Sequence, residues 1–259
     1  MLSIFFLFGV LFCLSTIAQR PGDYVVENHP PLLWHNCTAP SACTTINSSL
    51  VVDANLRWIH EARGWRSCFS DGRWDYEICR NETSCTANCV VEGIDNYSLQ
   101  YGVRTANDSV SLKLVTKIEF GENVGPRVFL LDATKTKYQT FVLQGNEFAF
   151  DADLATVECG INSALNFVAM DADGGIERFK GTDIIGPSYG TGYCDAQCPM
   201  DGKFVGGKVS SRLYVLTPEE RKADTGRLTP KAGSPRPLTR SQGKGNMEPA
   251  VRNSPRGKL

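Results

Sequence analysis

The distribution of apolar residues between positions 50 and 170 predicts strands rather than helices. Apolar residues there alternate with polar ones or form short runs, and clusters of Asn, Asp, Gly and Thr separate these runs. The predicted strands are residues 50–53, 111–116, 127–131, 139–143, 147–153 and 164–170. No apolar stripe with a helical period reaches helical length, and no long internal repeat is present. We therefore expect an all-β sandwich with long loops and few helices.

The first 18 residues have the pattern of a secretory signal peptide. Residues 2–17 are almost entirely apolar, a run too short to span a bilayer comfortably, and Ala18 is a small residue suited to signal peptidase. We predict cleavage after Ala18 and a secreted, extracellular protein, with a membrane anchor or a buried N-terminal helix as the alternative. Since no second apolar run of spanning length follows, we expect no membrane segment in the mature chain.

Five asparagines match the acceptor pattern Asn-x-Ser/Thr for N-linked glycosylation. They are Asn36, Asn47, Asn81, Asn96 and Asn107. One such match is weak evidence, but five behind a signal peptide predict a eukaryotic extracellular glycoprotein. We therefore expect these five positions to face solvent.

The cysteines point to disulfide bonds rather than to a metal site. Nine remain once Cys13 leaves with the signal peptide, and six of these lie between positions 37 and 89, where they can pair locally. An oxidising compartment favours disulfides, and the spacing lacks the paired knuckles and histidines of a zinc site. We expect no metal and no cofactor. Because nine is odd, at least one thiol stays unpaired, and Cys159, Cys194 and Cys198 have no obvious mates.

Charge is distributed unevenly along the chain. Residues 1–208 hold 16 Lys and Arg against 24 Asp and Glu, which argues against nucleic acid as a partner of the main body. Residues 209–259 hold 11 basic against 4 acidic residues, with six Pro and no Cys, Trp or Phe. This composition predicts a basic, disordered tail, either without function or in electrostatic contact with a polyanion or a surface.

Several blocks of sequence, taken in order, resemble one enzyme family. They are residues 29–34 (HPPLLW), 52–60 (VDANLRWIH), 101–103 (YGV), 146–153 (NEFAFDAD), 159–162 (CGIN), 170–175 (MDADGG) and 192–199 (GYCDAQCP). Together with Cys37 and Cys43, these blocks are similar to the N-terminal part of the catalytic domain of glycoside hydrolase family 7, the fungal cellobiohydrolases and endoglucanases. The resemblance extends over about residues 19–208.

The resemblance implies a fold, an activity and a disulfide pattern. The fold is a concanavalin-like (jelly-roll) β-sandwich with long loops over a glucan groove or tunnel, incomplete in this chain. The activity is hydrolysis of β-1,4-glucosidic bonds in cellulose or another β-1,4-glucan with retention, by a monomer. Residues 170–175 and 201–204 look closer to the cellobiohydrolase branch than to the endoglucanases. The implied disulfides are Cys37–Cys43, Cys68–Cys89 and Cys79–Cys85.

The same resemblance implies residues that bind sugar on the glycone side of the groove. Trp58 matches an aromatic platform whose indole face stacks on a glucose ring, and a position in the hydrophobic core is its alternative. The matching polar positions are Asn123, Arg127, Asn162, Tyr193, Gln197, Asp201 and Lys203. Ordinary solvated loop residues are the alternative for each of these.

The paired carboxylates of a retaining glycosidase are missing from this sequence. The family carries them as Glu-x-Asp-x-x-Glu on one strand, and none of the 13 glutamates here is followed two residues later by Asp. Glu147, Asp151 and Asp153 would share one face of a predicted strand, but we interpret them as polar surface groups. The turn at 171–175 lacks the acidic twelfth position of a calcium loop. We therefore predict no catalytic residue here, and a noncatalytic carbohydrate-binding fragment is the alternative function.

The resemblance to the family ends at about Lys208. Val209 and Ser210 follow, a dipeptide whose codons can overlap the usual 5′ end of an intron. Our hypothesis is an unspliced intron or a frame error, with a true short isoform as its rival. On either interpretation we expect a partial catalytic domain over residues 19–208.

Overall fold

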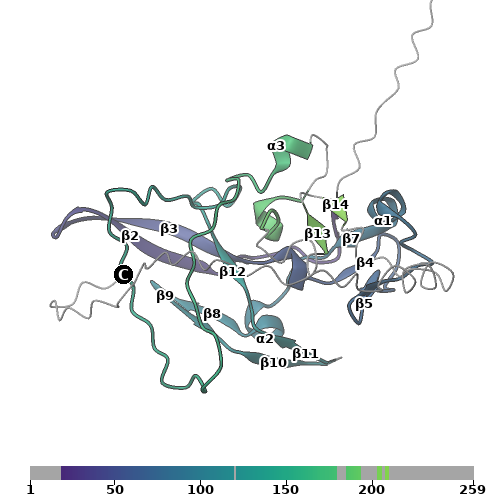
Figure 1. Cartoon of the computed structure of the whole chain (residues 1–259), viewed down its shortest axis with the longest axis horizontal. Helices are drawn as coiled ribbons and strands as arrows, with labels where there is room; N and C mark the ends of the chain where they lie inside the picture. The colour runs from purple at the N-terminus through teal and green to yellow at the C-terminus, as the bar shows by residue number, and fades with distance from the viewer. Residues whose placement is uncertain (1–18, 120, 180–184, 194–202, 206–207, 210–259) are drawn as a thin grey trace, which may run out of the picture. The chain divides into compact units, whose positions relative to one another are not determined.

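Strands dominate the part of the chain described by the computed structural model, which comprises residues 19–119, 121–179, 185–193, 203–205 and 208–209 (Figure 1). The strands are β1 (Arg20–Pro21), β2 (Pro31–Ala39), β3 (Ala42–Val52), β4 (Ile59–Glu61), β5 (Phe69–Ser70), β6 (Arg73–Trp74), β7 (Cys89–Val91), β8 (Val103–Ala106), β9 (Ser109–Leu112), β10 (Val115–Ile118), β11 (Gly121–Val124), β12 (Val128–Leu131), β13 (Phe204–Val205) and β14 (Lys208–Val209). The helices are α1 (Glu82–Asn88), α2 (Tyr97–Tyr101) and α3 (Ile176–Phe179), with 3₁₀ turns η1 (Ala54–Leu56) and η2 (Pro187–Tyr189). The described chain is therefore mostly strand and loop, as predicted.

A three-stranded antiparallel sheet, in the order β12-β3-β2, organises the first part of the core. Its central strand β3 ends in Leu50, Val51 and Val52, whose side chains alternate between two faces. Leu50 and Val52 pack with Val103 and the tyrosines of α2, whereas Val51 packs with Leu131 and Tyr138. The inner end of β3 is thus covered on both sides, which explains its continuous apolar run.

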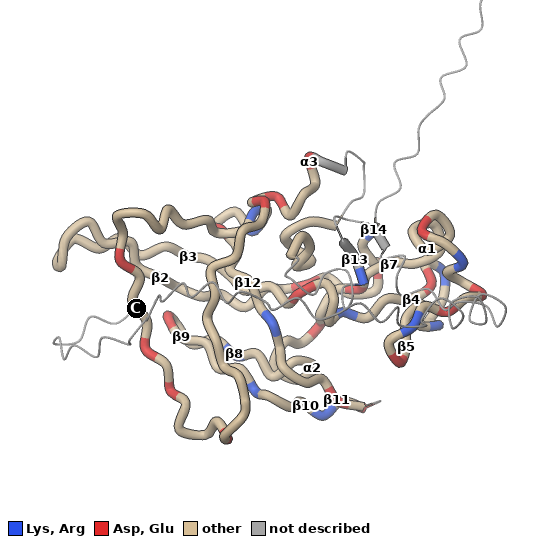
Figure 2. The backbone as a smooth tube through the Cα atoms, in the orientation of Figure 1, with Lys and Arg blue, Asp and Glu red and all other residues tan. Residues whose placement is uncertain are grey.

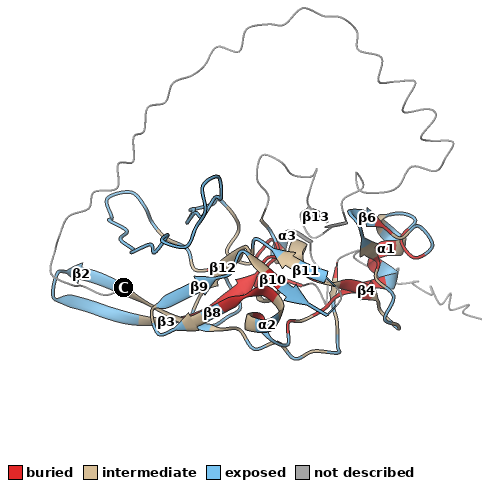
Figure 3. Cartoon of the chain, turned by 90° about the horizontal axis from the view of Figure 1, so that it is seen from below, coloured by how far each residue is buried: buried red, intermediate tan, exposed pale blue. Residues whose placement is uncertain are grey.

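The outer part of the β2–β3 hairpin extends away from this core and is largely exposed (Figure 3). The sequence pattern did not predict β2 or the first half of β3. Residues 35–47 are mainly polar or small, and β2 has only the short apolar run of Leu32, Leu33 and Trp34 before them. Eight residue pairs across the two strands nevertheless keep them in register, including Cys37 opposite Cys43. Pairing with a neighbour, rather than burial, makes this segment a hairpin.

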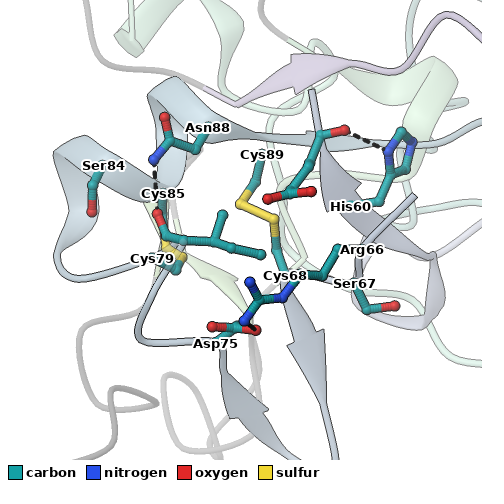
Figure 4. The surroundings of a disulfide bond; sticks show 12 residues. His60, Arg66, Ser67, Cys68, Asp75, Cys79, Ser84, Cys85, Asn88 and Cys89 are labelled. Carbon is teal, nitrogen blue, oxygen red and sulfur yellow. Dashed lines mark hydrogen bonds and ion pairs between the residues drawn. A yellow bond between two sulfur atoms is a disulfide. The ribbon is translucent and has the colours of Figure 1, made fainter. Parts of the chain in front are cut away.

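A second core lies in residues 59–91, which we call the disulfide lobe. It contains β4, which pairs with β7, the small β5–β6 hairpin and helix α1. Ile59, Trp74, Ile78 and Val91 pack there against the sulfur atoms of four buried cysteines. Figure 4 shows the surroundings of the Cys68–Cys89 disulfide in this lobe. The Asn88 amide donates to the Ile78 carbonyl at 2.8 Å.

The single strand predicted at 111–116 is in fact two strands in different hairpins. Residues up to Leu112 belong to β9, which pairs with β8, and residues from Val115 belong to β10, which pairs with β11. At the junction the Lys113 N–H donates to the Gly102 carbonyl at 3.0 Å, and the Leu114 carbonyl accepts from Gly125 at 2.7 Å. These two hydrogen bonds fix the backbone between the two hairpins. The alternation of apolar residues continues through this junction although the strand pairing does not, so the sequence pattern predicted one strand.

The three strands predicted at 139–143, 147–153 and 164–170 are wrong, since none of these residues forms a strand. The segment leaves the sheet after the Gln139 N–H donates to the Leu130 carbonyl at 2.9 Å, and none of the described strands pairs with the residues that follow. Its phenylalanines gather with one another instead, and Phe141 lies 5.3 Å from the Trp34 ring. Four acidic residues and no Lys or Arg lie at 139–170 (Figure 2). Glu147, Asp151 and Asp153 are exposed there, as expected for surface groups.

The helices are short and capped by side chains. Asn81 accepts from the Ser84 N–H at 2.9 Å at the start of α1, and Asn96 accepts from the Leu99 N–H at 2.9 Å at the start of α2. Asp173 accepts from the N–H groups of Gly175 and Glu177 near α3, and these bonds lower its pKa. Among the described residues, no helix has the length and apolar character needed to cross a membrane.

Candidate functional site

The strongest cluster of predicted site residues surrounds residues 53–58, which follow β3 and which we call the 53–58 segment. Asp53 directly follows β3 and caps η1, accepting from the Asn55 N–H at 2.8 Å. The Ala54 N–H donates to the Gly190 carbonyl at 3.0 Å. Gly190 has a φ of +73°, and a side chain there would overlap the Val52 carbonyl, so this close approach requires glycine.

Arg127 is fixed to this segment by an ion pair. Its Nε donates to Asp53 Oδ2 at 2.5 Å, and its guanidinium lies 4.6 Å from the centre of the Tyr193 ring. The Asp53 side chain is 1% exposed, whereas that of Arg127 is 39% exposed. Burial raises the pKa of the Asp53 carboxyl, and the nearby Arg127 opposes that rise. A buried carboxylate thus positions a guanidinium that reaches solvent.

Lys203 approaches the same segment from a part of the chain 146 residues away. Its backbone N–H donates to Asn55 Oδ1 at 2.8 Å, and its Nζ donates to the Arg57 carbonyl at 3.3 Å. Nζ also lies 4.9 Å from the centre of the Phe69 ring. Burial lowers the pKa of Lys203 to about 8, against an opposing contribution from Asp53. This ammonium group is therefore held in a partly desolvated position.

Trp58 ends the segment in a half-buried position. Its Nε1 donates to Ser67 Oγ at 2.8 Å, and its ring stacks on His60 with centres 4.1 Å apart. The side chain is thus neither fully in the core nor free on the surface. Its half-buried position does not match a tryptophan fully inside the core, and stacking of Trp58 on a glucose ring stays a prediction.

A buried ion pair between Arg57 and Glu27 restrains the 53–58 segment. The Arg57 guanidinium donates to both carboxylate oxygens of Glu27, at 2.5 and 2.8 Å, and both side chains are at most 5% exposed. The Tyr97 hydroxyl donates to the same carboxylate, and burial raises the pKa of this phenol. Arg57 also lies 5.1 Å from the centre of the Tyr189 ring. A bidentate pair of this kind restrains the segment geometrically.

Four predicted sugar-binding residues are therefore gathered in one place, and the others are not. Asn123 lies on β11, where its amide donates to the Gln100 carbonyl at 2.6 Å. Asn162 is exposed in the irregular 139–170 segment. Gln197 and Asp201 lie outside the described residues. Sequence reasoning missed the roles of Asp53, Asn55 and Arg57, although the first two directly follow a buried apolar run, where a strand end was expected.

The three implied disulfides are present as Cys37–Cys43, Cys68–Cys89 and Cys79–Cys85. Cys159 is an exposed free thiol, while Cys194 and Cys198 lie outside the described residues. Across the described ranges, no three His, Cys, Asp or Glu side chains gather as ligands for a metal ion.

All five predicted glycosylation sites are exposed. Asn81 and Asn96 also cap helices, but they do so through Oδ1 as an acceptor. A glycan is attached at the amide nitrogen, so attachment is compatible with both caps. Glycosylation of these sites remains a prediction.

Comparisons with known proteins agree on one family. The sequence model of glycosyl hydrolase family 7 matches residues 21–232, a range that continues past Lys208. A family 7 cellobiohydrolase from Daphnia pulex is 39% identical, with a TM-score of 0.71 over 78% of this chain and 46% of that chain. A cellobiohydrolase from Melanocarpus albomyces, crystallised with cellotetraose, is 49% identical, with a TM-score of 0.68 over 74% of this chain and 44% of that chain.

A third solved structure, the endocellulase EGI from Humicola insolens, is 36% identical, with a TM-score of 0.64 over 75% of this chain and 48% of that chain. The protein thus spans less than half the length of each of these three structures. Their likeness confirms the predicted fold class, an all-β sandwich that is incomplete in this chain. With the family model covering most of its length, the chain belongs to glycosyl hydrolase family 7.

Proposed function

We propose that this protein derives from a secreted, cellobiohydrolase-like β-1,4-glucanase, and that its 259 residues bind a β-1,4-glucan chain beside the 53–58 segment. The observation that carries the proposal is the convergence of Trp58, Arg127, Tyr193 and Lys203 around that segment, from parts of the chain far apart in sequence. Family membership supports glucan as the ligand, and the Melanocarpus relative was crystallised with cellotetraose.

The chemistry of these groups suits a sugar. A guanidinium and an ammonium donate hydrogen bonds to hydroxyl groups, and an aromatic ring packs against the apolar face of a pyranose. The Asp53 carboxylate holds the Arg127 guanidinium, and Asn55 holds the backbone of Lys203, before any ligand arrives, which reduces the entropy lost on binding. Sugar-binding sites need such a small set of well-placed polar groups next to an aromatic surface.

Hydrolysis with retention needs a nucleophile and an acid/base roughly 5–5.5 Å apart. Because Glu-x-Asp-x-x-Glu does not occur in these 259 residues, we propose that they bind glucan without cleaving it. We therefore propose a noncatalytic, glucan-binding function for this polypeptide, although it belongs to a family of hydrolases. We further propose that it acts as a monomer outside the cell, without a metal or other cofactor.

A cellulose pull-down combined with a reducing-sugar assay tests the proposal. We expect the secreted 259-residue chain to bind amorphous cellulose and to release no reducing sugar above background. Replacing Arg127 with Ala should weaken binding about tenfold or more, because a fixed charged donor is lost. Arg104→Ala is the matched control, since Arg104 is exposed and bonds only locally to Ser98. Equal binding by the two variants, or no binding by the parent chain, would contradict the proposal.

The processing of the chain can be tested separately. We propose that the mature protein begins at Gln19 and carries glycans on the five exposed asparagines, with a basic tail from Val209. Mass spectrometry of secreted protein, before and after removal of N-glycans, checks the first two points. Sequencing of the mature transcript across the Lys208 codon tests the third point. A transcript that encodes Val209–Leu259 supports the tail, and one that continues in a family-like reading frame contradicts it.

A further inference from the structure

Four aromatic rings lie in near-parallel contact next to the 53–58 segment, and we call them the aromatic platform: Tyr24, Trp58, His60 and Trp65. Tyr24 stacks on Trp65 with centres 4.3 Å apart and on His60 at 4.9 Å. Trp58 stacks on His60 at 4.1 Å and lies 6.0 Å from Trp65. The angles between these ring planes are all between 14° and 27°. The four rings therefore share one orientation.

Hydrogen bonds hold each of three rings in place. The Tyr24 hydroxyl donates to the Gly64 carbonyl at 3.3 Å, and Trp58 is bonded to Ser67. His60 Nδ1 lies 3.0 Å from the Gly64 carbonyl, and its Nε2 lies 2.9 Å from Glu92 Oε2. The turn that carries Trp65 is thereby tied to strand β4 and to the N-terminal segment.

The platform continues from the proposed glucan site out to solvent. His60 is completely buried and Trp58 is half-buried, but Tyr24 is 40% exposed and Trp65 is 71% exposed. Although Tyr24 and Trp58 lie beside it, an exposed fraction this large leaves most of the Trp65 indole open to water. A large apolar ring fixed in this way has no role in the core.

The surroundings of Trp65 limit what can dock on it. Arg63 and Arg66 are exposed on either side of it in sequence, and Arg66 pairs with Asp75 and Glu77 at 2.7 Å. The exposed apolar surface of the platform is thus Trp65 and part of Tyr24, next to charged side chains. A stable protein interface needs roughly 800 Å² on each partner, far more than these two rings provide. A pyranose ring has the matching size and an apolar face.

We propose that Trp65, backed by Tyr24, is an additional pyranose-stacking subsite that extends the Trp58 side of the glucan site outward. Its ligand is a β-1,4-glucan chain, either a soluble oligosaccharide or a chain at a polymer surface. The inference rests on the proposed function, because it requires glucan to reach Trp58. The stacked and hydrogen-bonded rings make the subsite rigid before binding, so little side-chain entropy is lost when a sugar arrives.

The test measures binding of the full chain to cellohexaose by calorimetry and to amorphous cellulose by depletion. Trp65→Ala should weaken binding about tenfold, equivalent to about 1.4 kcal/mol, while Trp65→Phe should retain most of the affinity. Tyr76→Ala is the matched control, because Tyr76 is also an exposed aromatic in the disulfide lobe but lies outside the platform. Since Trp65 is exposed, thermal unfolding of its variants should match that of the parent.

The outcomes separate this inference from the proposed function. Loss with both ligands supports a subsite for single glucan chains, and loss with cellulose alone supports one for chains at a polymer surface. If Trp65→Ala binds both ligands like the parent while Arg127→Ala binds weakly, the platform inference is overturned and the proposed function stands. If the parent chain binds neither ligand, both are overturned.

Discussion

The disulfide lobe at residues 59–91 and the segment at 139–170 have similar apolar and aromatic sequence patterns but different structures. Both contain short apolar runs and several aromatic residues. In the lobe, Ile59, Trp74, Ile78 and Val91 are at most 5% exposed, and two buried disulfides join the strands and helix. In the 139–170 segment, by contrast, Phe148, Phe150 and Phe167 are between 41% and 48% exposed, and no strand forms.

The difference is the presence of a partner. Strand β4 has β7 beside it, in register from Ile59 opposite Val91 to Glu61 opposite Cys89. The 139–170 segment has no ladder partner among the described residues, although its alternation is clearer than that of β4. Alternation therefore indicates which residues suit a sheet, whereas pairing decides whether a sheet forms.

The largest expected effect comes from removing Cys68–Cys89, one of the two buried disulfides of the lobe. Replacing both Cys68 and Cys89 with Ala should lower the free energy of unfolding by about 2–5 kcal/mol, because the unfolded chain loses a constraint and the core loses packed sulfur. Urea unfolding measures the change. Cys159→Ser is the control, since this thiol is exposed and unpaired, and it should leave the unfolding midpoint unchanged. A similar loss of unfolding free energy in both variants would contradict the claim that the lobe is packed and the 139–170 segment is not.

One substitution made in both settings sharpens the comparison. Leu131 is completely buried on β12, and Leu165 is 49% exposed in the 139–170 segment. Leu131→Ala should cost about 2–5 kcal/mol through lost burial and a cavity. Leu165→Ala should change stability by less than about 0.5 kcal/mol. A cost at Leu165 comparable with that at Leu131 would show that the segment is packed in solution.

The desolvated Lys203 provides a test that depends on pH. Its pKa is lowered to about 8 in the folded protein, so between pH 8 and the ordinary lysine value of 10.5 the unfolded chain binds more protons and stability rises with pH. Lys203→Met removes the buried charge and should stabilise the protein by about 1–2 kcal/mol at pH 7. The advantage should fade as the pH rises through 8 toward 10.5. A gain that persists unchanged at pH 10 would mean that the ammonium is not its source.

The smallest expected effect concerns the cap of helix α1 in the lobe. Asn81→Ala removes both the cap and the predicted glycan, whereas Thr83→Ala removes only the glycosylation signal. We expect Asn81→Ala to be less stable than Thr83→Ala by about 1 kcal/mol, the usual value of an asparagine cap. Thermal unfolding of the two secreted variants measures the difference. Identical midpoints would show that the cap contributes nothing.

Part of the site was predictable from sequence and part was not. Arg127, Tyr193, Lys203 and Trp58 were expected to bind sugar through family resemblance, and the structure places them around one segment. No sequence pattern indicated that Asp53 would hold Arg127, because the two residues are 74 positions apart. Trp65 carried no signal either, since its role depends on the rings that stack beside it.

By itself, the sequence predicted the all-β class from local alternation. The order of its motifs resembles family 7, and that resemblance implied the family and the three disulfide pairs. The tertiary structure alone decided which apolar runs became strands, since a strand needs a hydrogen-bonding neighbour, which β4 has and which residues 139–170 lack within the described part of the chain. It also decided that a buried carboxylate fixes Arg127 and that Trp65 extends the aromatic surface of Trp58. Such contacts join distant parts of the chain, and only folding brings their partners together.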